Sequence, residues 1–581
     1  MNYAASAQPE ITVKLPGWRA TVLFSILLAG LAGLLARGVY LQGIHDDFLQ
    51  KKGNARYSRV IEVSAHRGRI SDRNGETLAV STPVESVWAS PSDVEADKQQ
   101  VRKLAQILGM NTEELKSRLF DTSRDFVYLK RLLPPEQAEK VVRLNLPGVS
   151  LQREYRRFYP AGEEFAQTLG FTGQDDVGQE GMELALQKQL AGKHGSQRVI
   201  RDNRGSIVED AGSLNPAKPG SDIVLSLDSK LQHIAYRELE SAVRQHQAKA
   251  GAVVILDARS GEVLALANYP GYNPNNRKNA SARALRNRAI TDLFEPGSTM
   301  KPFTVAMALE AGKVNPRTVV NTEHGVFTLS GRKIHDTHPE SSLTVAQVIQ
   351  KSSNIGSAKI AGMLRSEAMW QGLSDSGFGV QTGSNFPGEA LGKLRDPKTW
   401  RPIEQATMSY GHGISVSLLQ LARSYTVFAN DGELKPISLL KLDEPVGGVR
   451  VTGKKIFSER TARQISDMLE MVVLPGGTAP LAQVAGYRVA GKTGTAHKLE
   501  DGRYVNHYVA SFVGFAPVSD PRLVVAVMID DPSGTKYYGG EVAAPVFSKV
   551  TGSALHALNV PNDAPLDNVI APPDYIVKEE V

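Results

Sequence analysis

The sequence predicts an α+β protein that begins with a single transmembrane helix, continues through an elongated mixed domain, and ends in a larger domain with helices covering an antiparallel sheet. Its 581 residues exceed what one hydrophobic core normally organises, so at least two domains are expected. An uncharged apolar run occupies residues 20–36. In the C-terminal half, strand-like segments precede and follow a series of helical ones, which is the element order of an α+β domain.

The composition excludes several classes of function. The formal net charge is +6, and the Lys and Arg residues are spread among nearly as many acids, which argues against nucleic-acid binding. The chain has no cysteine, so disulfides and thiolate metal sites are excluded. It also lacks an H-E-x-x-H motif, a P-loop and a GxGxxG segment after a strand, and we therefore expect no metal and no cofactor.

The N-terminal segment predicts a membrane anchor. Residues 1–19 form a short tail, and residues 20–41 just reach the length that spans a bilayer. A cleaved signal peptide is the main alternative, favoured by small residues such as Ala29-Gly30, and a buried soluble helix is a third. The length of the apolar run and the lack of an A-x-A site after it favour the uncleaved anchor. Because cations flank both ends, the positive-inside rule does not set the orientation, and the short tail is the easier part to leave in the cytoplasm.

Residues 42–220 contain no catalytic constellation, and we interpret them as a spacer domain. Asn74-Gly75 lies between alternating apolar residues and predicts a β-hairpin. Residues 94–119 and 135–142 have the periodicity of helices with charged outer faces. The charged segments at 156–160 and 178–183 are expected to form salt bridges that tie this domain to the next.

Residues 221–560 are predicted to form the second domain, followed by a disordered tail at 561–581. Its first strands are expected at 251–257 and 262–268, joined by a turn at Arg259-Ser260-Gly261. Further strands and helices are expected in the following order: helices around Ser298, Val345 and 417–430; strands at Lys492, 508–516 and 523–530; and a last helix beginning near Ala544.

Ser298-Thr299-Met300-Lys301 is the most informative stretch of the chain. Proline and glycine break the chain just before Ser298, so the serine is expected in a first helical turn. Residues three apart on a helix share a face, which puts Lys301 beside the Ser298 hydroxyl. A serine hydroxyl is a weak nucleophile until a base takes its proton, and a neutral lysine can do so. Because a free lysine titrates near ~10.4, we expect Lys301 to be desolvated.

Two later segments complete a motif set. Ser352-Ser353-Asn354 gives S-x-N, and Lys492-Thr493-Gly494-Thr495 gives K-T-G at the start of a strand. S-x-x-K, S-x-N and K-T-G in this order are the motifs of serine β-lactamases and penicillin-binding proteins. Each string alone is weak, but the three together at domain-scale spacing are specific.

With its anchor and the glycine-rich Tyr410-Gly411-His412-Gly413, the chain resembles the class B penicillin-binding proteins, most closely the division-specific peptidoglycan D,D-transpeptidases of the FtsI type. The resemblance extends from the anchor to about Asn559. It implies a serine β-lactamase-like catalytic domain after a dimerisation-type domain. It also implies an inner-membrane protein with a single span and its catalytic domain in the periplasm.

The resemblance assigns a role to each motif residue. Ser298 attacks a D-Ala-D-Ala peptide stem, Lys301 is its base, and Ser352 carries a proton to the leaving nitrogen. Asn354 holds Lys301 and a substrate amide. Lys492, Thr493 and Thr495 bind the terminal carboxylate, and Gly494 leaves room for the acyl group. The oxyanion hole is expected at the backbone N–H groups of Ser298 and Thr495.

The implied function is cross-linking of peptidoglycan stems of diaminopimelate type at the division septum, with β-lactams as inhibitors. The implied partners are a membrane-embedded glycan polymerase and other division proteins. Three alternatives stay open: a D,D-carboxypeptidase or β-lactam-hydrolysing enzyme, a penicillin-sensing receptor, and a non-catalytic scaffold of the division complex. Two other features are less specific. His412 is expected to be a cleft-wall or structural residue, and Tyr537 and Tyr538 either contact substrate or pack.

Overall fold

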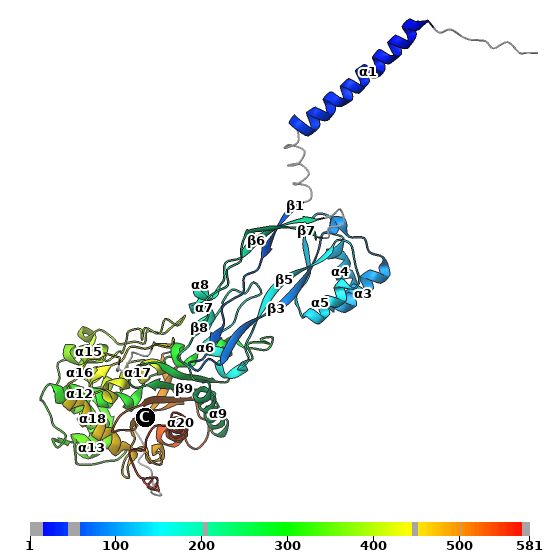
Figure 1. Cartoon of the computed structure of the whole chain (residues 1–581). Helices are drawn as coiled ribbons and strands as arrows, with labels where there is room; N and C mark the ends of the chain where they lie inside the picture. Colours follow the sequence, from blue (N-terminus) through cyan, green and yellow to red (C-terminus); the bar gives the residue numbers. More distant parts are fainter. Residues whose placement is uncertain (1–15, 45–57, 202–206, 444–450, 501, 572–581) are drawn as a thin grey trace, which may run out of the picture. The chain divides into compact units, whose positions relative to one another are not determined.

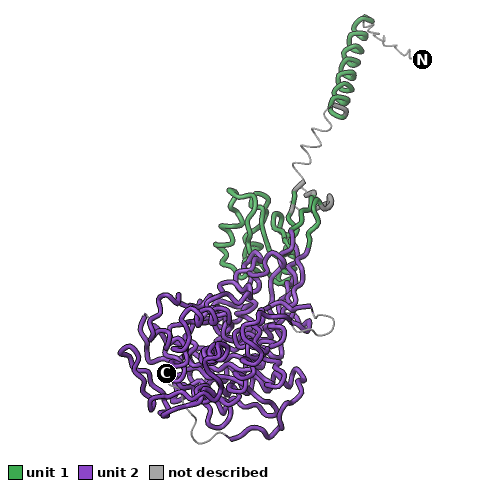
Figure 2. Tube along the Cα trace, turned by 90° about the vertical axis from the view of Figure 1, so that its left-hand side faces the viewer, with its two compact units in different colours: residues 1–64, 84–154, 194–218 green, residues 65–83, 155–193, 219–581 purple. Residues whose placement is uncertain are grey.

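The computed structural model describes residues 16–44, 58–201, 207–443, 451–500 and 502–571. The chain falls into two compact units, coloured separately in Figure 2. The first unit comprises residues 1–64, 84–154 and 194–218, and the second comprises residues 65–83, 155–193 and 219–581. The units therefore interleave along the sequence, whereas the predicted division lies at residue 220. The domain boundaries given above remain a prediction.

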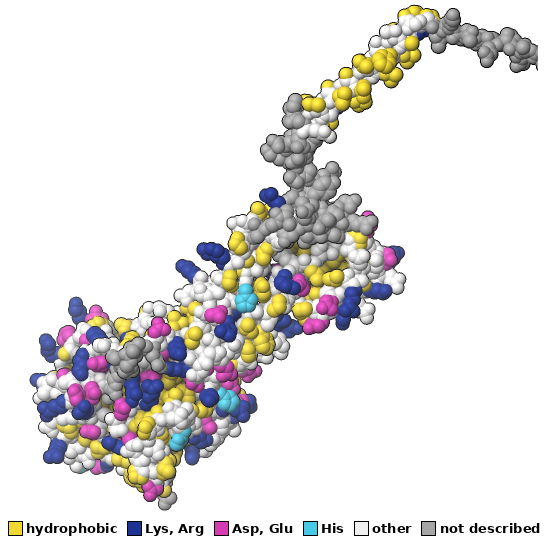
Figure 3. All heavy atoms as spheres, viewed as in Figure 1, with side chains coloured by type: hydrophobic (Ala, Val, Ile, Leu, Met, Phe, Trp, Pro, Cys, Tyr) yellow, Lys and Arg dark blue, Asp and Glu magenta, His cyan; other side chains and the backbone are white. Residues whose placement is uncertain are grey.

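The N-terminal helix α1 (Gly17–Val39) is followed by a π-helical turn at Tyr40–Ile44. Within the described part of the chain it is the one helix long and apolar enough to cross a membrane, and it buries none of its side chains. Figure 3 shows hydrophobic side chains gathered along α1. Exposed apolar surface of this extent is what the interior of a bilayer would cover. The helix is consistent with a single-pass membrane anchor.

In the first unit, α3 (Lys98–Leu108) and α4 (Thr112–Leu119) take the place of the single helix predicted over 94–119. The break has a local cause. Gly109 adopts φ 61°, which ends α3, and the Asn111 side chain then accepts the backbone N–H of Glu113 to cap α4. Other elements of this unit include the 3₁₀ turn Pro91–Asp93, α5 (Pro135–Val142), β4 (Val127–Leu133), the first part of β5 (Val149–Phe158), and a sheet of β1 (Ser58–Val63), β6 (Gly195–Arg201) and β7 (Ile207–Asn215) in the order β1-β6-β7.

The second unit is built on a five-stranded antiparallel sheet in the order β10-β9-β19-β18-β17. Its strands are β9 (Ala250–Asp257), β10 (Val263–Tyr269), β17 (Ala490–Glu500), β18 (Arg503–Ala516) and β19 (Leu523–Asp530). Every residue of β9 is buried, which requires cover on both faces of the sheet. The continuous apolar runs of β9 and β19, rather than an alternating pattern, reflect this environment. The predicted α+β fold class is confirmed.

Helices supply that cover (Figure 1). α9 (Ser229–Gln245) packs on α20 (Ala544–Ala557), and both helices contact the sheet. The sheet is also contacted by α17 (Leu418–Ala429), which packs on β19, and by α18 (Glu459–Val473), which packs on β17. Shorter helices complete the unit: Gly162–Phe165, α6 (Ala166–Leu169), α7 (Gly181–Ala185), α8 (Gln187–Leu190), α10 (Ala282–Leu285), α11 (Arg288–Thr291), Glu323–Gly325, α15 (Ser366–Asp375), Pro397–Thr399, α16 (Pro402–Met408) and Pro480–Ala482. Small two-stranded ladders pair β11 (Val319–Asn321) with β14 (Ser342–Thr344), β12 (Val326–Leu329) with β13 (Arg332–His335), and β15 (Glu433–Leu434) with β16 (Lys454–Lys455).

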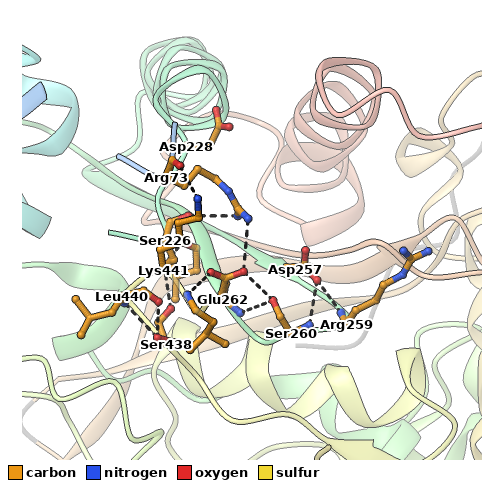
Figure 4. Close-up of polar contacts among 12 residues, drawn as sticks. Arg73, Ser226, Asp228, Asp257, Arg259, Ser260, Glu262, Ser438, Leu440 and Lys441 are labelled. Atoms are coloured by element: carbon orange, nitrogen blue, oxygen red, sulfur yellow. Dashed lines mark hydrogen bonds and ion pairs between the residues drawn. The ribbon is translucent and has the colours of Figure 1, made fainter. Parts of the chain in front are cut away.

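The predicted Asn-Gly hairpin joins β2 (Ile70–Ser71) to β3 (Thr77–Ala89), and β2 also pairs in parallel with β8 (Ile223–Val224). Beside this hairpin, the Arg73 guanidinium lies 3.5 Å from the carboxylate of Glu262, a buried residue that directly precedes β10. Figure 4 shows Glu262 also accepting the Ser260 hydroxyl. These contacts attach the hairpin to the sheet and belong to its framework.

The charged segments at 156–160 and 178–183 meet in a buried ion cluster within the second unit. The fully buried Glu183 carboxylate accepts Arg67 Nε at 2.7 Å and Arg157 Nε at 2.6 Å. Burial raises the pKa of nearby Asp176 to about 6, although Arg67 and Arg157 oppose that rise. The cluster binds residues 65–83 to residues 155–193. The sequence predicted salt bridges from these segments to residues 221–560, whereas the ion pairs of this cluster join residues that all precede position 221.

Residues 561–581 were predicted to be a disordered tail, but the structure shows that the first part of this tail makes specific hydrogen bonds. Asp563 accepts the backbone N–H of Arg488 at 2.7 Å, and the Asn568 side chain accepts that of Gly486 at 2.9 Å. Residues 562–570 are therefore fixed against the segment that precedes β17. Low apolar content does not prevent order here, because side-chain oxygens satisfy backbone donors of a neighbouring loop. Residues 572–581 lie outside the described residues.

Candidate active site

Ser298 lies in a 3₁₀ turn (Gly297–Met300) that runs directly into α12 (Lys301–Glu310). The predicted helical spacing brings Lys301 Nζ within 2.8 Å of Ser298 Oγ. The Lys301 side chain is fully buried and that of Ser298 is nearly so, which confirms the predicted desolvation of the lysine. Burial disfavours the charged form of an amine. A hydroxyl and an amine are therefore in hydrogen-bond contact at a site with little access to water.

Ser352 lies on the other side of the same amine. Lys301 Nζ donates to the Ser352 carbonyl oxygen at 2.5 Å and lies 3.0 Å from Ser352 Oγ. Ser352 has φ 62°, a left-handed conformation that costs a non-glycine residue energy and persists only where its surroundings hold it. That geometry turns both of its oxygens toward Lys301. The structure thus joins the S-x-x-K and S-x-N segments through one nitrogen atom.

Asp336 holds the S-x-N segment in place. Its carboxylate accepts the Ser353 hydroxyl at 2.5 Å and the backbone N–H of Ile355 at 3.0 Å. The next helix after α13 (Val345–Gln350) is α14 (Asn354–Ala361). Ser353 caps α14 by accepting the Gly356 N–H. Asp336 was not among the predicted site residues, since it lies outside all three motifs.

Asn354 is the first residue of α14 and is buried. Among the described residues its side-chain amide makes no hydrogen bond, so the expected hold of Asn354 on Lys301 is not present in this structure. The three contacts of Lys301 described above go to serine oxygens instead. The Asn354 amide keeps its donors and acceptor available for another group.

The K-T-G segment lies on β17, one of the two edge strands of the five-stranded sheet. Lys492 is fully buried, with Nζ 3.1 Å from Thr493 Oγ1, and Thr493 Oγ1 is 2.7 Å from Thr478 Oγ1. Gly539 is the first residue of the short helix α19 (Gly539–Val542), and its N–H donates to Thr495 Oγ1 at 3.0 Å. One cation and two hydroxyls are thus gathered on one strand.

Two glycines allow the backbone segments of the site to approach one another. A Cβ on Gly494 would lie 2.6 Å from the carbonyl oxygen of Pro296, so only glycine lets β17 lie against the turn before Ser298. Gly411 has φ 90°, and a Cβ there would lie 2.1 Å from the carbonyl oxygen of Gly297. Both the K-T-G strand and the Tyr410-Gly411-His412-Gly413 segment therefore pack directly against the nucleophile turn.

A cavity of about 790 Å³ lies beside these segments. Its walls come from four parts of the second unit: Arg286 and Thr291–Glu295; Lys393, Arg395 and Gly413–Ser415; Ala496–Leu499 of β17; and Tyr504, Val509, Met528 and Asp530. One wall ends three residues before Ser298, and another begins at the residue after Thr495. The cavity is therefore continuous in sequence with both the nucleophile turn and the K-T-G strand.

Glu295 is the acid of this cavity closest in sequence to Ser298. Its carboxylate accepts the Gly413 N–H at 2.8 Å and the Tyr504 hydroxyl at 3.0 Å. Burial raises the pKa of Glu295, against the opposing effects of these two hydrogen bonds and the charge of Arg395. Sequence reasoning missed Glu295 and Tyr504, which are 209 positions apart. No short motif could signal that pair.

His412 and the tyrosine pair lie at the margins of the site. Burial, followed by the charges of Lys301 and His497, lowers the pKa of His412 to about 4. Its ring packs edge-on against Tyr410 at 5.3 Å, as expected for a wall residue. Tyr537 stacks between Tyr508 at 4.3 Å and Tyr538 at 4.4 Å, so the two tyrosines pack on each other.

Comparisons with known proteins agree with this geometry. Residues 251–552 match the penicillin binding protein transpeptidase domain, and residues 62–225 match the penicillin-binding protein dimerisation domain. The chain is 44% identical over 540 residues to a probable peptidoglycan D,D-transpeptidase PenA of Neisseria meningitidis, with 92% of each chain covered. It is 42% identical over 554 residues to the peptidoglycan D,D-transpeptidase FtsI of Escherichia coli, covering 94% of this chain and 93% of that one.

A solved structure is also similar. The transpeptidase domain of Burkholderia pseudomallei penicillin-binding protein 3 aligns at 50% identity with a TM-score of 0.54, covering 59% of this chain and 98% of that one. Identity and coverage at these levels establish the family. The chain therefore belongs to the class B penicillin-binding proteins, with a dimerisation domain ahead of a transpeptidase domain.

Proposed function

We propose that the chain is a peptidoglycan D,D-transpeptidase that works through an acyl-enzyme on Ser298. The observation that carries this proposal is the buried contact of 2.8 Å between Lys301 Nζ and Ser298 Oγ. A desolvated amine in direct contact with a hydroxyl is the arrangement that activates a serine without a histidine. Membership in the transpeptidase family makes peptidoglycan stem peptides and β-lactams the ligand classes of the site.

In the first half-reaction, neutral Lys301 takes the proton of Ser298 as Oγ attacks the carbonyl carbon of the penultimate D-Ala. The peptide bond to the terminal D-Ala breaks, and its nitrogen leaves with a proton delivered from Lys301 through the Ser352 hydroxyl. Ser352 suits this transfer because a hydroxyl accepts and donates at once and Lys301 Nζ lies 3.0 Å from its oxygen. The backbone N–H groups of Ser298 and Thr495 stabilise the oxyanion.

In the second half-reaction, the amine of another stem attacks the ester carbonyl and loses a proton to Lys301. The bond to Ser298 Oγ breaks, and the serine regains a proton. The new amide joins two stems. Attack by water instead would make the enzyme a carboxypeptidase, so the fraction of ester that is transferred to an added amine distinguishes the two activities.

Lys492, Thr493 and Thr495 bind the terminal carboxylate of the donor stem. Their ammonium and hydroxyl groups lie on one strand, and charge-assisted hydrogen bonds of this kind are stronger than neutral ones. Asn354, with its amide free of hydrogen bonds to the described residues, is placed to bind a backbone amide of the stem. Gly494 lets the acyl group lie close to β17.

The cellular setting follows from the anchor and the relatives. We propose that α1 holds the protein in the inner membrane with the residues that follow the anchor in the periplasm, and that the enzyme acts at the division septum with a membrane-embedded glycan polymerase and other division proteins. Protease added outside spheroplasts should digest all but the anchor and the short tail. Protection of the catalytic unit would reverse the orientation.

Mass spectrometry after exposure to penicillin tests the catalytic assignment. Wild-type protein should gain one penicillin mass on the peptide that contains Ser298. Ser298→Ala should lose this adduct, because the removed oxygen is the atom that forms the bond, while its thermal unfolding stays close to that of wild type. An adduct that persists in Ser298→Ala would remove Ser298 from the mechanism.

A further inference from the structure

The 562–570 segment, which follows α20, lies against the loop that leads into the K-T-G strand. This loop, residues 483–488, connects the 3₁₀ turn Pro480–Ala482 to β17. It ends four residues before Lys492. Contacts that hold the loop therefore act close to the group that binds the carboxylate in the proposed function.

Asn568 satisfies several main-chain groups of the loop with one side chain. Its Oδ1 accepts the N–H of Gly486 at 2.9 Å, and its Nδ2 donates to the carbonyl oxygens of Val484 at 3.2 Å and Tyr487 at 3.0 Å. Gly486 has φ 79°, and a Cβ on it would lie 2.9 Å from Asn568 Nδ2, so glycine lets the amide enter the turn. An amide both accepts and donates, which matches the N–H and C=O groups that the loop presents.

Asp563 connects the start of β17 to the turn between β18 and β19. Its Oδ1 accepts the N–H of Arg488 at 2.7 Å, and its Oδ2 accepts the Ser519 hydroxyl at 2.9 Å. The Arg488 carbonyl accepts the N–H of Val518 at 3.1 Å from the same turn. The Arg488 guanidinium also donates to both carboxylate oxygens of Glu470 on α18, each at 2.7 Å. The residue that lies two positions before β17 is thus fixed through its N–H, its carbonyl and its side chain.

The loop is linked to K-T-G on both sides. After the loop the chain enters β17, which carries Lys492 and Thr493. Before the loop lies Thr478, whose hydroxyl is 2.7 Å from that of Thr493. Because β17 is an edge strand, β18 holds it from one side only, and its flanking segments contribute to its position. A shift of the loop would move the carboxylate-binding groups, whereas the contact of Lys301 with Ser298 depends on the spacing within one helical turn.

We propose that the 562–570 segment is a positioning element of the carboxylate site, in which Asn568 and Asp563 align Lys492 and Thr493 through the loop. Neither of the two aligning residues touches substrate. The inference rests on the proposed function, because it assumes that K-T-G binds the carboxylate of a donor stem or of a penicillin. It gives a task in the reaction to a segment that contains none of the three motifs.

Acylation of Ser298 by a penicillin and by its methyl ester tests this assignment on the full-length protein in detergent. Only the acid presents a carboxylate to K-T-G, so the ratio of the two rates separates carboxylate binding from the attack of Ser298. Asn568→Ala removes the side-chain hydrogen bonds to the loop and should lower the acid-to-ester ratio. We expect a loss of about tenfold, less than the roughly 10²-fold that a shift of about 1 Å in a reacting group causes, with the ester rate nearly unchanged.

Asp567→Ala is the matched control. Asp567 lies in the same segment, is exposed, and makes no hydrogen bond to the part of the chain that the structure describes. This variant should keep the wild-type ratio. Asp563→Asn is a milder second variant, because its amide nitrogen cannot accept the Ser519 N–H that Asp563 Oδ2 accepts at 3.2 Å. It should lower the ratio by a smaller factor. Full labelling by the ester reports that a variant is folded, and Asp563→Asn decides if Asn568→Ala does not fold.

A double variant distinguishes positioning from a general loss of stability. In Lys492→Ala, the group that the segment aligns is already absent, so adding Asn568→Ala should change the ratio little. A further tenfold loss in the double variant would overturn the inference, and so would a wild-type ratio in the folded variants of Asn568 and Asp563. An unchanged ratio in Lys492→Ala alone would instead overturn the carboxylate role of K-T-G in the proposed function, and this inference with it.

Discussion

At the scale of single residues, the site contains two buried lysines with different surroundings. Lys301 contacts the hydroxyls of Ser298 and Ser352, whereas Lys492 contacts Thr493 on the sheet edge. Lys301→Ala should therefore slow acylation by every ligand, by about 10²–10⁴-fold as for loss of a general base. Lys492→Ala should slow a penicillin much more than its methyl ester, since only the free acid presents a carboxylate.

Stopped-flow acylation with the acid and the ester measures this difference. In Lys301→Ala the ratio of the two rates should match that of wild type, and in Lys492→Ala it should shrink. Equal losses for both ligands in both variants would contradict the separate roles of the lysines.

His412 gives a prediction for pH. Its folded-state pKa of about 4 lies below the ordinary value of 6.5, so between these values the unfolded chain takes up a proton that the folded protein does not. The His412 contribution to stability is therefore unchanged above pH 6.5 and falls as the pH drops from 6.5 toward 4. His412→Gln should lose less thermal stability than wild type over this window. Other acids such as Asp176 titrate in both proteins, so the difference between their melting curves is the measure, and parallel curves would contradict the assignment.

The motif residues could be predicted from the sequence, but the residues that hold them in position could not. The three-residue spacing of Ser298 and Lys301 fixes their contact because a helical turn fixes it. The left-handed Ser352 and the grip of Asp336 on Ser353 arise from the way in which distant segments meet. The same holds for Glu295, whose contacts come from Gly413 and Tyr504.

At the scale of elements, the packing of backbone on backbone at Gly411 supports the nucleophile turn. An added Cβ would overlap Gly297, so Gly411→Ala should displace the turn and slow acylation by roughly 10²-fold, the effect of a shift of about 1 Å in a reacting group. Gly383 is a matched control, because it has φ 84° but no atom within 4 Å of its Cβ position. Gly383→Ala shares the strained φ without the overlap and should acylate at nearly the wild-type rate. Equal rates for the two variants would show that the overlap is harmless.

Elements were predictable where local chemistry decides them. β19 spans the predicted residues 523–530, because a run of eight mostly apolar residues suits a strand buried on both faces. The predicted helix over 94–119 was wrong as a single element, since Gly109 and Asn111 together end one helix and begin another. Gly109 and Asn111 are typical of a helix end and a helix start, but the helical periodicity on either side of them obscured this break.

At the scale of the whole molecule, the interleaving of the two units could not be predicted, because no composition change marks residues 65–83 or 155–193 as partners of the C-terminal part. Their cohesion depends on the buried Glu183 and its two arginines. Glu183→Gln leaves Arg67 and Arg157 without a full counter-charge, and should destabilise the second unit by about 3–5 kcal/mol. Differential scanning calorimetry measures the loss.

Glu139→Gln is the control for that measurement. Glu139 lies on the exposed face of α5, 3.5 Å from Arg143, and an exposed pair of this kind contributes about 0–1 kcal/mol. Its melting curve should nearly match that of wild type. A similar small effect in Glu183→Gln would mean that the buried cluster does not hold the unit together.

The position of β17 at the margin of its sheet has one more consequence. A border strand leaves main-chain groups with no neighbouring strand, and an elongated peptide can bind there as a sixth strand. Main-chain hydrogen bonds do not depend on the side chains of the bound peptide. Affinity and selectivity therefore come from different groups: the edge strand can bind any extended stem, and the side chains around it determine which stem is preferred.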